Sequence, residues 1–280
     1  MREPTEFTMS RELTPAQRIE RSVIKKYRKE LWNPFIAAVK RYGLIEEGDR
    51  IAVCISGGKD SMLLALLMRQ LQRFSEVPFE LIYLSMDPGY APVNRRRIEE
   101  NARLLELPVE FFETDVFSSA EDAGGSHPCY LCARMRRGHL YAQAQKRGCN
   151  KIALGHHLND VIETVLLSMS YGAQLQAMPP KLDSSNFPGM KLIRPLYCIR
   201  EDDIIAWRNY NSLEFLRCAC RFSEAAEYDE NQSKRKEIKE LIHSMRQNNP
   251  QVEQNMFAAI HKVNLDTFPG YKQGGEMFTI

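Results

Sequence analysis

The chain has 280 residues, of which 44% are hydrophobic and 26% are charged, a balance typical of a globular protein and unlike that of a fibrous or wholly disordered one. Its formal net charge is only +2, so contact with a polyanion would depend on local basic patches. Residues 1–17 are polar and contain no apolar segment of the signal-peptide type, and no window approaches about 18 consecutive apolar residues. We therefore expect a cytoplasmic protein without membrane contact.

The predicted elements alternate between strands and helices after a flexible tail at 1–17 and a basic helix at 18–42, broken or kinked near Pro34. Strands are predicted at 50–55, 79–85, 109–114, 151–155 and 192–196, and helices at 63–71, 94–105, 134–146, 161–171, 202–210 and 234–245. This order predicts an α/β fold with a parallel, Rossmann-like sheet covered by helices on both faces. We assign 43–215 to this domain and 216–280 to a C-terminal extension that returns to it.

The first predicted strand ends in a glycine-rich loop with the sequence SGGKDS, from Ser56 to Ser61. Two glycines allow backbone N–H groups to approach phosphate, the serines add hydroxyl donors, Lys59 adds a cation, and the following helix N-terminus adds partial positive charge. A Gly-Gly pair alone would indicate only a tight turn. The full hexapeptide between a strand and a helix predicts an anion cradle, and it does not fit the Walker A pattern.

This loop resembles the signature of the PP-loop ATP pyrophosphatases, which cleave ATP between the α- and β-phosphates and attach AMP to a substrate oxygen. The resemblance implies that the end of the second strand approaches the adenosine and that Asp60 and Asp160 help to hold Mg²⁺, whose preferred ligands are carboxylate and phosphate oxygens. Helix capping is the alternative role of Asp160. The expected nucleotide-binding residues are Ser56, Gly57, Gly58, Lys59, Asp60, Ser61, Met86, Gly155, His156 and Asp160.

Two cysteines, Cys129 and Cys132, lie three residues apart just before a predicted helix, so both thiols can reach one metal. Local spacing leaves a zinc site, a redox pair and an iron–sulfur cluster open. Cys218 and Cys220 are the clustered thiols downstream, and they could complete such a site if the C-terminal part folds back. Cys54, Cys149 and Cys198 are each expected to be small buried hydrophobic residues.

Four segments in order resemble the tRNA 2-thiocytidine biosynthesis proteins: IEEGDRIAVCISGGKDS, HPCYLCARMRRGHLYAQA, KIALGHHLNDVIETVLLSMSYG and MPPKL. The resemblance covers about residues 43–197. It implies ATP-dependent adenylation of the C2 oxygen of a cytidine in the tRNA anticodon loop, followed by attack of sulfur and departure of AMP. It also implies a [4Fe-4S] cluster held by three cysteines, two of them Cys129 and Cys132, and a sulfur donor such as a cysteine desulfurase. Lys59, Asp60, Cys129 and Cys132 would then be catalytic.

Two departures from the family pattern stand out. Asn159 occupies a position in GHHLND where a carboxylate is usual. In the family the third cluster ligand usually lies in a proline-rich C-x-x-C segment, whereas this chain has LRCACRF. Cys218 and Cys220 therefore compete to be the third cluster ligand, and we favour Cys218. The different C-terminal part keeps open a second hypothesis, an iron–sulfur PP-loop enzyme acting on another base or on a small thiolated molecule, including sulfur removal.

RNA contact is compatible with the basic N-terminal helix and with arginines near the loop and the cysteine pair, although basic runs also occur on solvated faces. These arginines are Arg95, Arg96, Arg97, Arg134, Arg136 and Arg137. A non-catalytic, zinc-stabilised nucleotide-binding module is a third hypothesis, and an amidotransferase or lysidine-type ligase would leave the cysteines idle. The oligomeric state is open, with a homodimer as one candidate.

Overall fold

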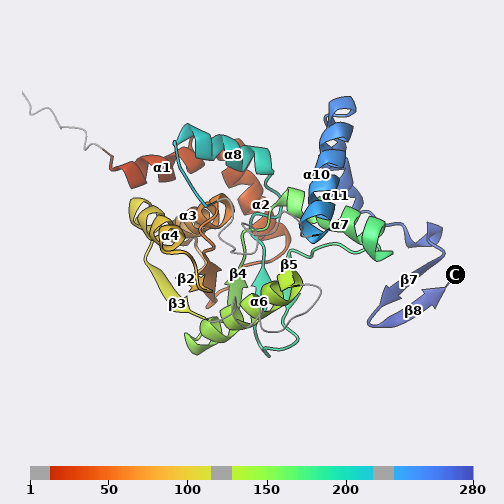
Figure 1. Cartoon of the computed structure of the whole chain (residues 1–280), viewed down its shortest axis with the longest axis horizontal. Coiled ribbons are helices and arrows are strands. Elements are labelled where there is room, and N and C mark those ends of the chain that lie inside the picture. The colour runs from red at the N-terminus through yellow and green to blue at the C-terminus, as the bar shows by residue number, and fades with distance from the viewer. Residues whose placement is uncertain (1–12, 115–127, 217–229, 280) are drawn as a thin grey trace, which may run out of the picture. The chain divides into compact units, whose positions relative to one another are not determined.

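The computed structural model of the chain describes residues 13–114, 128–216 and 230–279, with the side chains of 128–134 and 230–233 outside the description (Figure 1). The chain forms two compact units. The first contains the described parts of residues 1–157 and 180–227, and the second contains 158–179 with the described part of 228–280. No helix within the described ranges is both long enough and apolar enough to cross a bilayer.

The first unit is built on a six-stranded sheet in the order β3-β2-β1-β4-β6-β5. Its strands are β1 (Arg50–Cys54), β2 (Glu80–Asp87), β3 (Val109–Glu113), β4 (Lys151–Ala153), β5 (Lys181–Asp183) and β6 (Lys191–Ile193). All pairs are parallel except β5 with β6. The expected parallel α/β fold is confirmed, and the antiparallel edge strand β5 is an addition to it.

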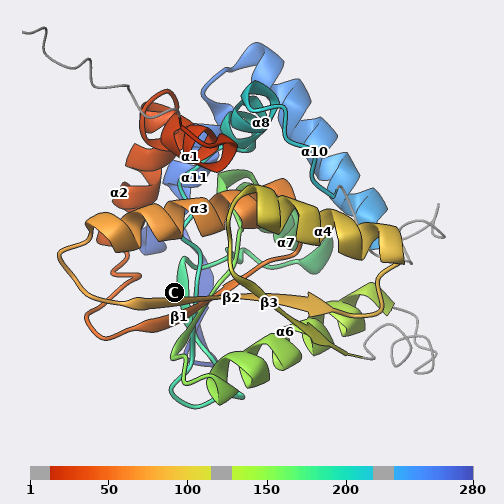
Figure 2. The same ribbon diagram turned by 90° about the vertical axis from the view of Figure 1, so that its left-hand side faces the viewer.

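Helices cover both faces of this sheet, as buried apolar strands require. The first unit contains α1 (Pro15–Ile24), a π-helical turn η1 (Arg28–Trp32), α2 (Asn33–Arg41), α3 (Lys59–Phe74), α4 (Pro92–Leu104), α6 (Pro128–Lys146) and α8 (Glu201–Tyr210). Val53 and Tyr83 face the larger core, to which α3 and α4 contribute, whereas Ala52 and Leu84 face a smaller core closed by α6. Figure 2 shows α3 and α4 on one side of the strands and α6 on the other.

The basic N-terminal helix is broken earlier than expected. Helix α1 ends at Ile24, and the π-helical turn at Arg28–Trp32 separates it from α2. Pro34 lies in the first turn of α2, where a missing N–H group leaves no intrahelical bond unmade. Trp32 has helical φ and ψ, so residues 28–41 stay helical through Pro34 while the form changes from π to α at Asn33. This change agrees with the predicted break or kink near Pro34, and the end of α1 at Ile24 is an additional break.

A buried lysine fixes the position of β4 beside β1. Lys151 is fully buried, and its Nζ donates to Asp49 Oδ2 at 2.6 Å and to the carbonyl oxygen of Leu44 at 3.2 Å. An unpaired ammonium group would be too costly to bury, so these acceptors specify the strand's register. The carboxyl end of β4 is thereby held next to the end of β1.

The second unit consists of α7 (Leu158–Gly172), α10 (Glu230–Asn248), α11 (Val252–Ala259), a short turn η2 (Leu265–Thr267) and a hairpin of β7 (Gly270–Gln273) with β8 (Glu276–Thr279). Leu158 and Ile162 of α7 pack against Ile238 and Ile242 of α10. The hairpin was not predicted. Its turn residues Gly274 and Gly275 have φ of +60° and +96°, the left-handed conformations that two-residue hairpin turns require.

Candidate active site

The sheet has a topological switch point between β1 and β4. From β1 the chain continues to β2 and β3 on one side, and β4 then pairs with the other side of β1. In open parallel sheets the loops that follow two such strands diverge and leave a crevice at the carboxyl edge, where ligands bind. Here these loops are residues 55–58 after β1 and residues 154–157 after β4, so most of the predicted nucleotide-binding residues of this unit lie at one edge.

The loop after β1 is tightly folded around its glycines. Gly57 has φ of +85°, and a Cβ at this residue would lie 2.6 Å from Ile98 Cγ1. Ser61 Oγ accepts a hydrogen bond from Ser56 N at 3.1 Å and donates to the carbonyl oxygen of Gly58 at 3.0 Å. Gly58 is the N-cap of α3 and provides no side-chain cap, so the partial positive charge of the helix N-terminus lies within the loop.

The loop after β4 approaches the start of α3 at the level of the backbone. A Cβ at Gly155 would lie 3.0 Å from both the carbonyl carbon of Asp60 and the nitrogen of Ser61. Residues with side chains rarely allow such an approach, which explains why glycine occupies this position. The structure thus brings Gly155 into contact with two residues in the first turn of α3, directly after the loop that follows β1.

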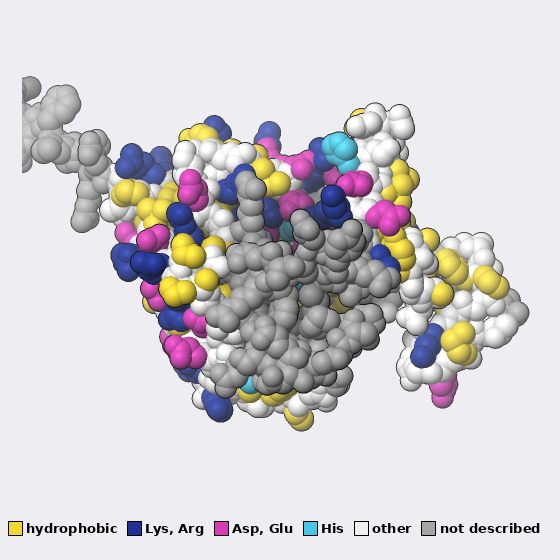
Figure 3. All heavy atoms as spheres, in the orientation of Figure 1, with side chains coloured by type: hydrophobic (Ala, Val, Ile, Leu, Met, Phe, Trp, Pro, Cys, Tyr) yellow, Lys and Arg dark blue, Asp and Glu magenta, His cyan; other side chains and the backbone are white. Residues whose placement is uncertain are grey.

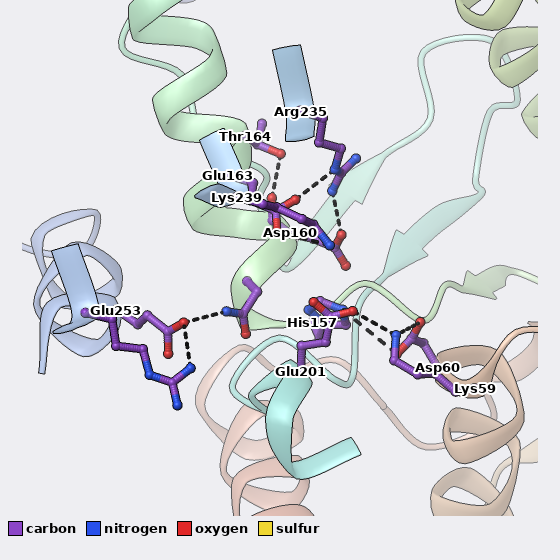
Figure 4. Close-up of polar contacts among 12 residues, drawn as sticks. Lys59, Asp60, His157, Asp160, Glu163, Thr164, Glu201, Arg235, Lys239 and Glu253 are labelled. Atoms are coloured by element: carbon purple, nitrogen blue, oxygen red, sulfur yellow. Dashed lines mark hydrogen bonds and ion pairs between the residues drawn. The ribbon is translucent and has the colours of Figure 1, made fainter. Parts of the chain in front are cut away.

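A charged cluster surrounds Lys59 at the same edge (Figure 4). Lys59 Nζ lies 3.1 Å from Asp60 Oδ2 and 2.9 Å from Glu201 Oε1, and His157 Nε2 lies 3.8 Å and 3.9 Å from Asp60 Oδ1 and Glu201 Oε1. Burial lowers the pKa of Lys59, but attraction to Asp60 and the hydrogen bond with Glu201 outweigh it, so the pKa is raised above its ordinary value. The lysine is therefore a fixed cation.

Glu201 and His157 were missed by the sequence analysis. Glu201 begins α8 and is separated from Lys59 by 142 residues, so no local pattern marks the contact. His157 is buried with 3% of its surface exposed and directly follows His156, which is half-buried. The doubled histidine after a predicted strand was the available signal for this pair.

The two cysteines of the HPCYLC segment lie in the first turns of α6, although their side chains are outside the described residues. Helix α6 connects the parallel strands β3 and β4, so it runs antiparallel to them. Its N-terminal end therefore lies at the carboxyl edge of the sheet, the side toward which the arrowheads of β2 and β3 point (Figure 2). Cys218 and Cys220 also lie outside the described residues. Leu216, two residues before Cys218, donates its N–H to the carbonyl oxygen of Gly57 at 3.2 Å.

The remaining cysteines have a structural role, as expected. Cys54 and Cys149 are buried, and Cys198 is partly buried. Burial raises the pKa of the Cys54 thiol to about 12 and that of Cys149 to about 11, and it also raises the pKa of Cys198. Thiols with such values remain protonated near neutral pH and are poor metal ligands.

Comparison with known proteins agrees with this geometry. Residues 22–242 match the family model of the PP-loop domain. A tRNA-cytidine(32) 2-sulfurtransferase of Geotalea uraniireducens is 37% identical over 229 residues, which cover 81% of this chain and 88% of that protein. The chain belongs to the PP-loop family of these sulfurtransferases. A second relative with the same name, from Geobacter metallireducens, is 36% identical over 245 residues, covering 85% of this chain and 91% of its own.

The PP-loop fold is also found in a solved structure, the U34-tRNA thiolase NcsA from Methanococcus maripaludis with its [4Fe-4S] cluster. The TM-score is 0.66 at 20% identity, with 86% of this chain and 80% of that chain covered. At this identity the likeness supports the fold alone. The resemblance to the thiolation family inferred from the sequence motifs is confirmed by the two relatives.

The residues of the PP-loop fit a nucleotide polyphosphate. Added Cβ atoms at Gly57 and Gly155 would lie 2.6 Å and 3.0 Å from neighbouring atoms. In both loops the backbone is therefore packed too closely against its neighbours to leave room for a side chain. The α3 N-terminus, the serine hydroxyls and Lys59 complete a set of donors and positive charge suited to phosphate oxygens. The Asp60 carboxylate supplies a ligand type that Mg²⁺ prefers.

The end of β2 carries a buried methionine and a paired aspartate. Met86 is 3% exposed and packs in the smaller core on the α6 side of the sheet. Asp87 Oδ1 accepts from the N–H groups of Gly89 and Tyr90, and Oδ2 pairs with Arg95 at 2.8 Å. Desolvation raises the pKa of Asp87, but these hydrogen bonds outweigh it and lower the pKa overall.

In the second unit, Asp160 pairs with α10 (Figure 4), and Asn159 pairs with α11. Asp160 Oδ1 lies 2.6 Å from Arg235 Nη2, and Arg235 Nε lies 2.8 Å from the buried Glu163. Asn159 Nδ2 donates to Glu253 Oε1 at 2.9 Å. An aspartate at 159 could not make this donation, which gives a physical reason for asparagine at that position.

The predicted RNA-binding arginines have unequal surroundings. Arg95 pairs with Asp87 and with Glu99 at 2.7 Å and lies over the ring of Phe111. Arg96 and Arg137 are exposed, Arg97 pairs with Glu214 at 3.3 Å, and Arg136 Nη2 donates to the Tyr90 hydroxyl at 3.5 Å. The Arg134 side chain lies outside the described residues. Arg95 is thus committed to internal contacts, whereas Arg96 and Arg137 face solvent.

Proposed function

We propose that this protein is an ATP-dependent tRNA thiolase that adenylates the C2 oxygen of a cytidine in the anticodon loop and replaces that oxygen with sulfur. One arrangement carries the proposal: the PP-loop, the Lys59 cluster and the N-terminal end of the cysteine-bearing helix α6 share one edge of a single sheet. The relative that is 37% identical is named a tRNA-cytidine(32) 2-sulfurtransferase, which supports tRNA as the class of substrate.

The chain's own residues would prepare the nucleotide. Gly57 and Gly58 would expose backbone N–H groups to phosphate oxygens, Lys59 would neutralise negative charge on them, and Asp60 would bind Mg²⁺. ATP, when bound, would supply the AMP group that turns the C2 oxygen into a leaving group, with pyrophosphate released. We extend the nucleotide site to His156 at the edge of this crevice, and the assignment of Asp160 to Mg²⁺ stays a prediction.

The cysteines would hold the sulfur-carrying group. Residues at i and i+3 of a helix lie on one face, so a pair of cysteines at this spacing suits one cluster. A [4Fe-4S] cluster, when bound, would present an open iron position to which a sulfur atom can be attached. Cys129 and Cys132 would be two ligands, with Cys218 or Cys220 as the third. Each turnover consumes one sulfur atom, so a donor such as a cysteine desulfurase is required, together with a thiol reductant that brings its persulfide sulfur to the sulfide level.

The test is anaerobic purification with iron, sulfide and zinc analysis, together with mass spectrometry of nucleosides from a strain lacking the gene and complemented with variants. We expect about four irons and four sulfides, lost in Cys129→Ala. We also expect 2-thiocytidine to disappear in the deletion strain and to stay absent with Lys59→Ala or Cys129→Ala.

The matched control is Cys149→Ala, which removes a buried thiol that has no place in the proposed site and should keep both cluster and product. Comparing Cys218→Ala with Cys220→Ala identifies the third ligand. Stoichiometric zinc with no iron would withdraw the sulfur-transfer mechanism. Unchanged 2-thiocytidine in the deletion strain would withdraw the substrate.

A further inference from the structure

Helix α1 and the turn that follows it carry a group of cations without ion pairs. Within the described parts of the chain, none of the following six exposed residues forms a salt bridge: Arg18, Arg21, Lys25, Lys26, Arg28 and Lys29. By contrast, Glu20 on the buried side of α1 is paired with Arg69 and Arg73 at 2.8 Å. The exposed cations are thus not needed to balance carboxylates of the fold.

The helical period gathers three of these cations on one side. Residues 18, 21 and 25 recur at the spacing of one helix face, whereas Ala16, Ile19 and Val23 form the buried face. Thr14 and Gln17 form a capping box that fixes where the helix begins. Figure 3 shows Lys and Arg side chains gathered on the surface over α1.

This face lines a groove of about 690 Å³, which we call the α1 groove. Its described lining contains four cations, Arg18, Arg21, Lys25 and Lys26, and no carboxylate. The opposite wall is formed by Leu104 at the end of α4 and by residues 210–213, which include the last residue of α8 and the three that follow it. Lys26 Nζ lies 3.7 Å from the ring centre of Tyr210, whose side chain is 53% exposed. A basic groove with an exposed aromatic wall suits a nucleic-acid strand.

The α1 groove lies close to the PP-loop along the chain. Leu213 lines the groove, and three residues later Leu216 hydrogen-bonds to Gly57. Three residues span at most about 10 Å, so the wall of the groove and the nucleotide loop are within that reach. Asn101 of α4 donates to the carbonyl oxygen of Glu214 and fixes this segment in between, while the Glu214 carboxylate pairs with Arg97.

We propose that the α1 groove binds the phosphate backbone of the RNA substrate and holds it so that a nearby base reaches the PP-loop edge. This inference rests on the proposed function, because it takes the substrate to be RNA. It assigns binding to Arg18, Arg21, Lys25 and Lys26. The charge complementarity between four unpaired cations and phosphate selects RNA as the occupant.

The test is equilibrium binding of an unmodified tRNA transcript to the full-length protein, without ATP, by fluorescence anisotropy at several salt concentrations. The variant is Arg21→Ala with Lys25→Ala, and alanine at exposed helical positions preserves the helix. If each residue contacts one phosphate, the plot of log association constant against log salt concentration becomes less steep by about 1.4 to 1.8. Affinity at 0.1 M salt then falls roughly 25- to 60-fold.

Two controls separate the groove from general charge effects. Lys40→Ala with Lys146→Ala removes two exposed cations elsewhere in the first unit and should leave affinity within about twofold, as surface charges outside the interface affect binding little. Arg21→Lys with Lys25→Arg preserves the charge and should retain most of the affinity. Circular dichroism and thermal unfolding check that each variant is folded.

The outcomes also separate this inference from the proposed function. If the wild type binds and thiolates tRNA but the groove variant keeps its affinity and salt slope, the groove assignment is wrong while the function stands. If the wild type binds no tRNA, both fail. If the groove variant instead loses binding to vesicles containing anionic phospholipid while tRNA binding is unchanged, the groove serves a membrane surface and the RNA assignment is overturned.

Discussion

Replacing Gly155 by alanine tests whether the close contact between the two loops of the PP-loop edge is required. The added Cβ would lie 3.0 Å from the carbonyl carbon of Asp60 and from the nitrogen of Ser61, and 3.2 Å from the carbonyl oxygen of Asp60. Ordinary contacts of a Cβ begin at 3.4 Å, so one of the two loops must move by a few tenths of an ångström. All three neighbours are backbone atoms, which cannot rotate away.

The cost follows from this geometry. Adding a methyl group to a packed site typically destabilises a protein by about 1–3 kcal/mol. If the loops relieve the overlap by separating, the same free energy is lost from nucleotide binding. Since about 1.4 kcal/mol corresponds to a factor of ten, ATP affinity should fall roughly 5- to 150-fold.

The assay pairs urea denaturation with calorimetric titration of ATP. Gly138→Ala is the control, because Gly138 lies inside α6 and an added Cβ has no neighbour within 4 Å among the described residues. That change should stabilise the protein by about 0.5–1 kcal/mol and leave ATP affinity unchanged. If Gly155→Ala kept wild-type stability and ATP affinity, the loops would not be in the contact described.

Three further changes probe individual contacts. Glu201→Gln removes a carboxylate that competes with phosphate for Lys59, so ATP affinity measured without Mg²⁺ should rise about fivefold; a decrease would contradict this. Asn159→Asp replaces the amide nitrogen that lies 2.9 Å from Glu253 Oε1 by a carboxylate oxygen. The free energy of unfolding at pH 7 should fall by about 1–3 kcal/mol, with partial recovery at pH 4 as one carboxyl group becomes protonated. Asp87→Asn should cost about 1 kcal/mol at neutral pH. Because the pKa of Asp87 is lowered in the folded state, the extra stability of the wild type should be fully present above pH 3.8, the ordinary pKa of the group. It should disappear as the pH falls through the folded-state pKa, which urea denaturation at a series of pH values can follow. A stability difference that does not change with pH would refute the ion pair.

The central sheet could be predicted from the sequence because its strands carry a local signal. Runs such as RIAVCI and FELIYLS are apolar and β-branched, and each is followed by turn residues and a helical segment. Strand β5 lacks this signal, since its sequence KLD contains a single apolar residue, Leu182, which is 46% exposed. The hairpin β7–β8 did carry one, the Gly274-Gly275 pair between two short strands.

The candidate site was only partly predictable for a different reason. SGGKDS is contiguous, so its glycines, lysine and serines could be recognised together. The contact of Lys59 with Glu201 and that of Asn159 with Glu253 join residues 142 and 94 positions apart, and each becomes visible only when the chain is folded. Likewise, the internal pairing of Arg95 depends on Asp87 and Phe111, which no basic-residue pattern takes into account.

The hydrogen bond from Leu216 to Gly57 has a consequence for how short a working version of this protein can be made. A chain truncated after Tyr210 would retain all six strands of the sheet and every helix of the first unit that the structure describes. It would nevertheless lack the peptide that covers Gly57 and the leucine that fills the space beside it. A shortened chain must therefore extend at least to Leu216 if it is to preserve the shape of its nucleotide loop.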